Sequence, residues 1–192
     1  MTVVYFVRHA HSPWLPNREA PRPISAEGHE AAATLATSLA PSPLDTVYSS
    51  PYARAVQTVE PIAVDHDHPV EVVADFRERQ LTDGPVEAIG ETFERAIDAV
   101  WADWDFAWPG GESNHEAQAR GVSALEALLY AHAGDHVVIG THGNLLTLML
   151  NHYDDRFDIE FWRNSLSMPD CYRVEFSGGE LHSSERLPAG QT

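Results

Sequence analysis

Two arginines, two histidines and one glutamate each come soon after a stretch of sequence that is typical of a strand. They are Arg8, His9, Arg54, Glu78 and His142. Arginine presents a planar fork of N–H donors that matches the oxygens of a phosphate group, and histidine titrates near neutral pH. Two arginines beside a histidine therefore indicate a site for a phosphoryl group, if the fold brings these side chains together.

Four short runs rich in β-branched and aromatic residues predict the strands that would do this. They span residues 3–7, 46–49, 70–73 and 137–140. The helical signals between them indicate a parallel sheet with right-handed crossovers on both faces. Ligands of such sheets bind outside the carboxyl ends of the strands, which is where the five side chains are expected to meet.

Apolar spacing and capping residues predict the helices. One helix is expected from Ser25 to Ala40, and the next has Pro51 at its first position. Apolar residues from Phe93 to Trp108 form one face of a third helix, which stops at Pro109. Further helices are expected over 113–133, 144–151 and 157–163. A final hairpin should turn at Gly178-Gly179. The expected fold is α/β, three layers (α/β/α) around a mostly parallel central sheet, in a single domain over residues 1–192.

Composition excludes several classes of protein. The 192 residues include 12 basic residues, all of them arginine, and 29 acidic ones, for a net charge of −17. Such a field repels nucleic acid and anionic membranes, so neither is an expected partner. No run reaches the ~18 apolar residues of a membrane span, and a cytoplasmic protein is expected. The single Cys171 forms no internal disulfide and is expected to be a small buried hydrophobe.

Five motifs, in order along nearly the whole chain, resemble those of the histidine phosphatase superfamily, which has the phosphoglycerate mutase-like fold. They are Val-Arg-His-Ala at 7–10, Ser-Ser-Pro-Tyr-Ala-Arg-Ala at 49–55, Arg-Glu-Arg at 77–79, Gly-Gly-Glu-Ser at 110–113 and Gly-Thr-His-Gly-Asn at 140–144. The resemblance implies that His9 is the phosphorylated nucleophile, that Arg8, Arg54 and His142 form the phosphate pocket, and that Glu78 is the proton donor. It implies no cofactor and no metal.

Other positions of the resemblance concern the substrate, which is expected to be a small phosphorylated metabolite. Ser12, Asn17 and Gly143 are further candidate substrate contacts. Ala10 stands where the usual motif has Gly, and Leu15 stands where the mutases have Asn after Ser-x-Trp. The segment from Glu78 to Gly110 is shorter than in cofactor-dependent mutases and holds no lysine, which favours hydrolysis over mutase chemistry.

Several of these side chains also have simpler interpretations. Glu78, between two arginines, could form a solvated ion pair, and Glu112 could orient pocket residues or cap the next helix. The Asp-His-Asp-His string at 65–68 has metal-ligand residue types but is expected to be solvated surface. The stripe of Trp101, Trp104 and Trp108 is expected in the core, with a pocket wall as the alternative.

The main functional hypothesis is a metal-independent phosphatase that hydrolyses a small phosphomonoester through phosphohistidine. The alternatives are a phosphoglycerate mutase-type phosphotransferase, a phosphoprotein (phosphohistidine) phosphatase, and a module that binds phosphate without turnover. A protein substrate needs an open site. The Trp-rich segment between Glu78 and Glu112 argues against an open site and so against a protein phosphatase. The presence of both His9 and Glu78 argues against a pure binding module.

Overall fold

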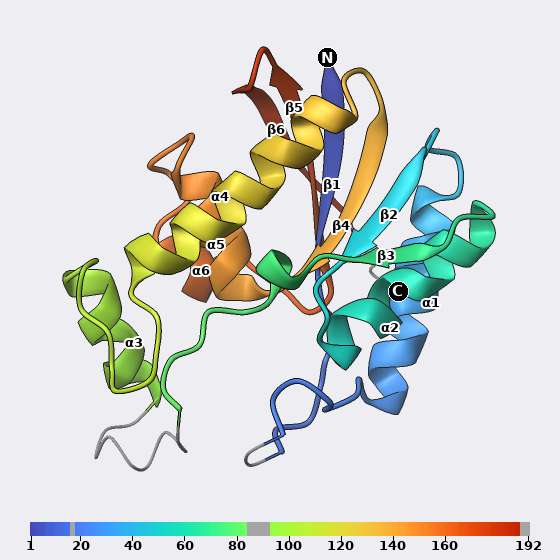
Figure 1. Cartoon of the computed structure of the whole chain (residues 1–192). Helices are drawn as coiled ribbons and strands as arrows, with labels where there is room; N and C mark the ends of the chain where they lie inside the picture. Colours follow the sequence, from blue (N-terminus) through green and yellow to red (C-terminus); the bar gives the residue numbers. More distant parts are fainter. Residues whose placement is uncertain (16–17, 84–92, 189–192) are drawn as a thin grey trace.

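A six-stranded sheet with the strand order β3-β2-β4-β1-β5-β6 forms the centre of the molecule (Figure 1). It is seen in a computed structural model that describes residues 1–15, 18–83 and 93–188. The strands are β1 (Thr2–Arg8), β2 (Thr46–Ser49), β3 (Val70–Val72), β4 (His136–Thr141), β5 (Asp170–Ser177) and β6 (Glu180–Leu187). The helices are α1 (Ala26–Leu39), α2 (Ala53–Asp65), the short 3-10 helix η1 (Ala74–Phe76), α3 (Phe93–Ala102), α4 (Asn114–Ala131), α5 (Gly143–Asn151) and α6 (Ile159–Asn164).

The four strands β3, β2, β4 and β1 are parallel, and they end at one edge of the sheet. β1 pairs with β4 so that Arg8 lies opposite Thr141, and β2 pairs with β4 so that Ser49 lies opposite Gly140. The predicted α/β fold with a mostly parallel sheet is therefore confirmed. This register also places the segments that follow β1, β2 and β4 next to one another.

The last two strands form an antiparallel hairpin on the β1 side of the sheet. β5 pairs with β1, and β6 pairs with β5. Gly178 and Gly179 connect them with φ angles of 62° and 87°. A two-residue turn of this kind needs positive φ at both positions, which glycine adopts without steric cost. The hairpin expected from the sequence is confirmed.

Helices cover both faces of the sheet and divide the core into two layers (Figure 1). Val4 and Phe6 of β1 pack on the face covered by α4 and α5, whereas Val3, Tyr5 and Val7 pack on the face covered by α1 and α2. The alternation follows from the two-residue period of a strand, and both faces are apolar because both are covered. Cys171 is fully buried in the second layer, as expected.

Several helix ends differ from the sequence predictions, and those of α2 and α3 differ for a reason that the structure shows. α2 begins at Ala53 rather than at Pro51, because the Ser50 hydroxyl accepts the N–H of Tyr52 and holds Ser50–Tyr52 in a turn, with Tyr52 extended as the N-cap. α3 ends at Ala102 and does not continue to Trp108. The Asp103 carboxylate accepts the backbone N–H of Asp105, and such local bonds compete with the helix.

None of the helices in the described part of the chain has the length and apolar character that crossing a membrane requires.

Candidate active site

The candidate site lies where β1, β2 and β4 end, and the parallel ladder continues into it. The His9 N–H donates to the Thr141 carbonyl at 3.0 Å, and the Ser50 N–H donates to the Gly140 carbonyl at 2.8 Å. As a result the rings of His9 and His142 lie 5.3 Å apart between centroids, at an angle of 61°. The two histidines predicted to meet at strand ends do so.

One ring nitrogen of His9 is engaged by its own backbone surroundings. Nδ1 lies 2.7 Å from the carbonyl oxygen of Ala10, which can only accept a hydrogen bond. Nδ1 therefore carries the ring proton. In the neutral imidazole this leaves the lone pair on Nε2, and His9 is one of the residues that line the adjacent cavity.

The surroundings of His9 keep its ring uncharged. Its side chain is buried, and this desolvation holds the pKa well below its ordinary value of 6.5, while the nearby positive charges of Arg54 and Arg8 lower it further. The bond to Ala10 opposes the shift but is the smaller effect. A neutral imidazole is the nucleophilic form, so burial and charge together prepare this residue for attack on an electrophile.

His142 is fully buried behind His9 and forms the N-cap of α5. Its Nε2 lies 2.7 Å from the Ser50 hydroxyl, and its ring also meets the ring of Tyr52 edge-on. Desolvation, followed by the charge of Arg54, holds its pKa well below 6.5. Among the described residues it does not line the cavity, so in this conformation it contacts His9 rather than the open space.

Two of the predicted phosphate ligands, Arg8 and Arg54, line the cavity as cations with little solvent around them. Desolvation lowers the pKa of both guanidinium groups, and nearby carboxylates partly compensate. Arg8 donates through Nη1 to the carbonyls of Leu166 and Ser167. Gly143 lets it approach, because a Cβ there would lie 3.0 Å from Arg8 Nε.

Arg54 is held by a residue that the sequence analysis did not select. Its Nη2 contacts the Glu19 carboxylate at 2.6 Å, and its Nη1 donates to the Glu19 backbone carbonyl at 2.6 Å. The same carboxylate accepts Nε and Nη2 of Arg22 at 3.1 Å each. The Glu19 carboxylate thus occupies Arg54, a side chain that is expected to bind phosphate. Nothing in its local sequence distinguishes it from other surface acids.

The carboxylate of Glu78 sits at the N-terminus of α5, directly beside the site. Oε1 accepts the N–H groups of Arg79 and Leu145, and Oε2 accepts the N–H of Asn144 at 3.2 Å. Of the two arginines that flank Glu78, Arg77 contacts Asp75 and Glu112 instead, whereas the buried Arg79 is close enough for the charge of Glu78 to raise its pKa. The bonds from three backbone N–H groups hold the Glu78 carboxylate at α5 rather than in a solvated pair. Glu78 lines the cavity, as a proton donor must.

The remaining predicted contacts are distributed as follows. Ser12 lines the cavity, but its hydroxyl donates to the Pro23 carbonyl at 2.7 Å and accepts from Arg22. Gly143 lines the cavity as well. Asn17 lies outside the residues that the structure describes.

The cavity is large enough for more than a phosphate group, with a volume of about 1080 Å³. Its described lining holds the cations Arg8, Arg22, Arg54 and Arg79 and the acids Glu19, Glu78 and Asp83. Arg79 is only 5% exposed, and desolvation lowers its pKa to about 10. With four cations against three acids, the cavity is locally positive in a chain of net charge −17.

The tryptophan stripe lies beside this cavity without forming its wall. Trp101, Trp104 and Trp108 are half-buried and belong to neither core layer, so the prediction that they lie in the core is wrong. None of the three is among the described lining residues either. Trp101 reaches the site indirectly, through a hydrogen bond of 3.4 Å to Asn144. The aromatic lining comes instead from Trp14, Tyr52, Phe93 and Trp162.

The Asp-His-Asp-His string at 65–68 lies far from this chemistry. His66 contacts the carbonyls of Ile62 and Ser42, and His68 contacts the carbonyl of Leu44. Over the described ranges, no group of three His, Cys, Asp or Glu side chains is arranged to hold a metal ion.

Comparison with known families agrees with this geometry. The model of the histidine phosphatase superfamily (branch 1) matches residues 4–186. The chain belongs to this superfamily. A search of curated proteins gave no significant match.

Several solved structures share this fold. YhfR of Bacillus stearothermophilus is 24% identical, with a TM-score of 0.79 and 95% of each chain covered. Mycobacterial glucosyl-3-phosphoglycerate phosphatase is 18% identical, with a TM-score of 0.75 and 96% coverage of each chain. A phosphoserine phosphatase mutant of Entamoeba histolytica, in complex with phosphoserine, is 16% identical, with a TM-score of 0.78 and 98% coverage of each chain.

The contact between Glu19 and Arg54 predicts that the Glu19 carboxylate competes with phosphate for the Arg54 guanidinium group. Glu19→Gln removes the negative charge from the arginines and should tighten the binding of inorganic phosphate about fivefold, the effect expected from an ion pair of about 1 kcal/mol. Isothermal titration calorimetry measures this affinity directly. Glu30→Gln, at an exposed position on α1, is the matched control. Weaker phosphate binding by Glu19→Gln would show that Glu19 supports Arg54 instead of competing for it.

The depressed pKa values of His9 and His142 predict a loss of stability in mild acid. Below pH 6.5 the unfolded chain protonates both rings whereas the folded protein does not, so the free energy of unfolding falls as the pH is lowered. Each histidine contributes a slope of up to about 1.4 kcal/mol per pH unit. Urea unfolding between pH 7 and pH 5 measures this slope. His142→Asn removes one of the two histidines and should reduce the slope by that histidine's contribution. A slope that His142→Asn leaves unchanged would contradict the buried neutral state.

Proposed function

We propose that this protein is a phosphatase that hydrolyses a small phosphomonoester through a phosphohistidine intermediate on His9. The observation that carries the proposal is the state of His9: neutral, with Nδ1 bonded to Ala10 and the Nε2 lone pair available, beside Arg8 and Arg54. Covalent capture divides a difficult hydrolysis into two phosphoryl transfers. The names of solved relatives, which include two phosphatases, support the same class of reaction.

In the first step His9 Nε2 attacks phosphorus, an N–P bond forms, and the P–O bond to the leaving group breaks. The charge on the equatorial oxygens is stabilised by Arg8 and by Arg54, once Glu19 has released it. Arg8 is already in place and largely desolvated, so it needs little reorganisation as the charge develops. Arg54 is also desolvated but must first exchange the Glu19 carboxylate for the phosphate oxygens.

Glu78 supplies the proton that the leaving alkoxide needs. Its Oε2 accepts a single N–H, from Asn144, which leaves a lone pair of this oxygen available to carry a proton. In the second step the ionised Glu78 takes a proton from water, the water oxygen attacks phosphorus, and the N–P bond breaks. Inorganic phosphate leaves, His9 is neutral again, and Glu78 is again protonated.

The substrate class follows from the size and lining of the cavity. A volume of about 1080 Å³ accommodates a phosphate group together with a small organic leaving group. Trp14, Phe93 and Trp162 add apolar surface to the lining, next to the arginines. A phosphorylated metabolite of low molecular weight therefore fits this site.

Phosphate release from a panel of phosphomonoesters, with aryl and alkyl members, tests the proposal. We expect turnover that a chelator leaves unchanged, because arginines carry out the charge stabilisation that a metal ion would otherwise provide. Product analysis of phosphoglycerates and a phosphohistidine peptide complete the assay. Isomerisation without phosphate release would identify a mutase, selective cleavage of the peptide a protein phosphatase, and phosphate binding without any turnover a binding module.

A further inference from the structure

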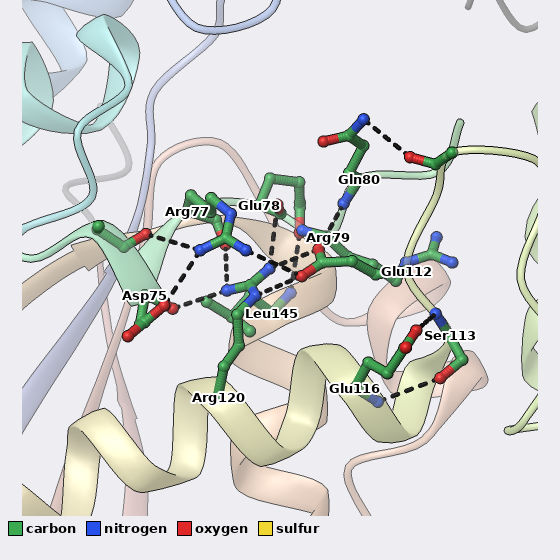
Figure 2. A network of polar contacts seen from close by, with 12 residues as sticks. Asp75, Arg77, Glu78, Arg79, Gln80, Glu112, Ser113, Glu116, Arg120 and Leu145 are labelled. Carbon is green, nitrogen blue, oxygen red and sulfur yellow. Dashed lines mark hydrogen bonds and ion pairs between the residues drawn. The ribbon is translucent and has the colours of Figure 1, made fainter. Parts of the chain in front are cut away.

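Arg120 of α4 uses all five of its side-chain N–H groups, three on the segment that carries Glu78 and two on Glu112. Nη1 donates to the carbonyls of Asp75 and Arg77 at 2.7 and 3.0 Å, and Nη2 donates to the carbonyl of Glu78 at 3.3 Å. Nε and the second N–H of Nη2 go to Glu112, at 2.6 and 2.8 Å. Figure 2 shows the guanidinium group reaching from the helix into this network.

Glu112 holds the same segment together with Arg120, and we call these two side chains the clamp. Besides the fork of Arg120, its carboxylate accepts the backbone N–H of Gln80 at 2.9 Å and Nη2 of Arg77 at 3.1 Å (Figure 2). Burial opposes its negative charge, but the bonds from Arg120 and Gln80 outweigh this and hold the pKa of Glu112 below its ordinary value. The carboxylate is therefore a permanent anion at neutral pH.

Gly111 brings this clamp close to the segment that it holds. A Cβ at this position would lie 2.2 Å from the Leu81 carbonyl oxygen, which is backbone and cannot move aside. The Glu112 N–H donates to the Gln80 carbonyl at 2.7 Å across the same contact. The Gly-Gly-Glu-Ser motif thus has a structural meaning: glycine allows the approach, Glu112 makes the bonds, and Ser113 caps α4.

The bonds fix the backbone on both sides of Glu78, at the carbonyls of residues 75, 77 and 78 and at the N–H of residue 80. The side chain is fixed separately by the N–H groups of Asn144 and Leu145. Arg120 does not line the described cavity and has only 12% of its side chain exposed. It is therefore placed to affect the reaction indirectly, through the segment that carries Glu78.

We propose that Arg120, together with Glu112, is a positioning residue for Glu78: the pair clamps the backbone of residues 75–80 and so sets the Glu78 carboxyl group against α5 at the reacting oxygen. The proposal rests on the proposed function in its assignment of Glu78 as proton donor. A displacement of about 1 Å can cost about 100-fold in rate, so loosening this clamp reduces proton donation even when the protein stays folded.

The variant Arg120→Lys keeps the positive charge but loses the fork and most of its bonds to carbonyls. On an alkyl phosphate, which needs the proton, we expect kcat to fall about 10- to 100-fold. On an aryl phosphate, whose phenolate leaves without a proton, the loss should stay below about threefold. Arg173→Lys, which alters an arginine–glutamate pair on β5, is the control and should change neither rate.

A double-mutant cycle with Glu78→Gln separates positioning from general stability. If Arg120 acts through Glu78, Arg120→Lys adds little to the alkyl-to-aryl rate ratio once Glu78 is already Gln. Glu112→Gln, which keeps Arg120 and weakens the clamp, gives the same pattern if Arg120→Lys does not fold. A lower melting temperature with an unchanged rate ratio would reduce Arg120 to a purely structural residue.

Amide hydrogen exchange of Asn144 and Leu145 tests the inference without any turnover. Glu78→Ala removes the acceptor of these N–H groups and should speed their exchange. Arg120→Lys should speed the same two amides, with no further increase in the double variant. Unchanged exchange in Arg120→Lys would overturn the inference. If Glu78→Gln slows aryl and alkyl phosphates equally, the proton-donor role fails, while the exchange data still decide whether Arg120 fixes Glu78.

Discussion

The hydrogen bond from His9 Nδ1 to the carbonyl of Ala10 is the contact on which the chemistry depends. It is made by the residue next in sequence, so it needs no distant partner. It decides which ring nitrogen is free. Burial and the charges of Arg54 and Arg8 then keep the ring neutral. The parallel register of β1 and β4 places the ring of His142 against that of His9.

Two arginines, Arg120 behind the site and Arg54 in it, are held by the rest of the chain in different ways. Arg120 has an acceptor for every side-chain N–H and holds the segment 75–80 in place. Arg54 is instead paired with the half-exposed carboxylate of Glu19, which we expect phosphate to displace. A fully bonded arginine suits a permanent position, whereas an arginine on an exchangeable anion suits a ligand site. The difference follows from burial and from the number of fixed acceptors around each guanidinium.

The sequence predicted best where a local pattern decides the structure. The apolar run before Arg8, the capping serines at 25 and 113 and the glycine pair at 178–179 each specify an element by themselves, and the strand ends then place His9 and His142 together. It predicted worst where side chains compete with backbone patterns. The aromatic spacing up to Trp108 indicates a helix, but the carboxylate of Asp103 accepts a backbone N–H after the helix ends.

Long-range polar contacts were also outside the reach of the sequence. Arg120 lies 42 residues from Glu78 and Glu19 lies 35 residues from Arg54, and both look like ordinary surface charges in the sequence. Their roles depend on how α4 and the loop before α1 pack against the strand ends. Glu112 was identified as a residue that orients the pocket or caps a helix. The structure gives the cap to Ser113 and Glu116, and leaves Glu112 for the clamp.

The most direct measurement of the mechanism is the position of the phosphoryl group on the enzyme. The native protein and His9→Ala would be mixed rapidly with labelled aryl phosphate and quenched in alkali, where phosphohistidine is stable. Peptide mapping and phosphorus NMR then give the residue and the isomer. We expect phosphate on Nε2 of His9 and none on His9→Ala. Phosphate on Nδ1, on another residue, or undiminished turnover by His9→Ala would contradict the mechanism.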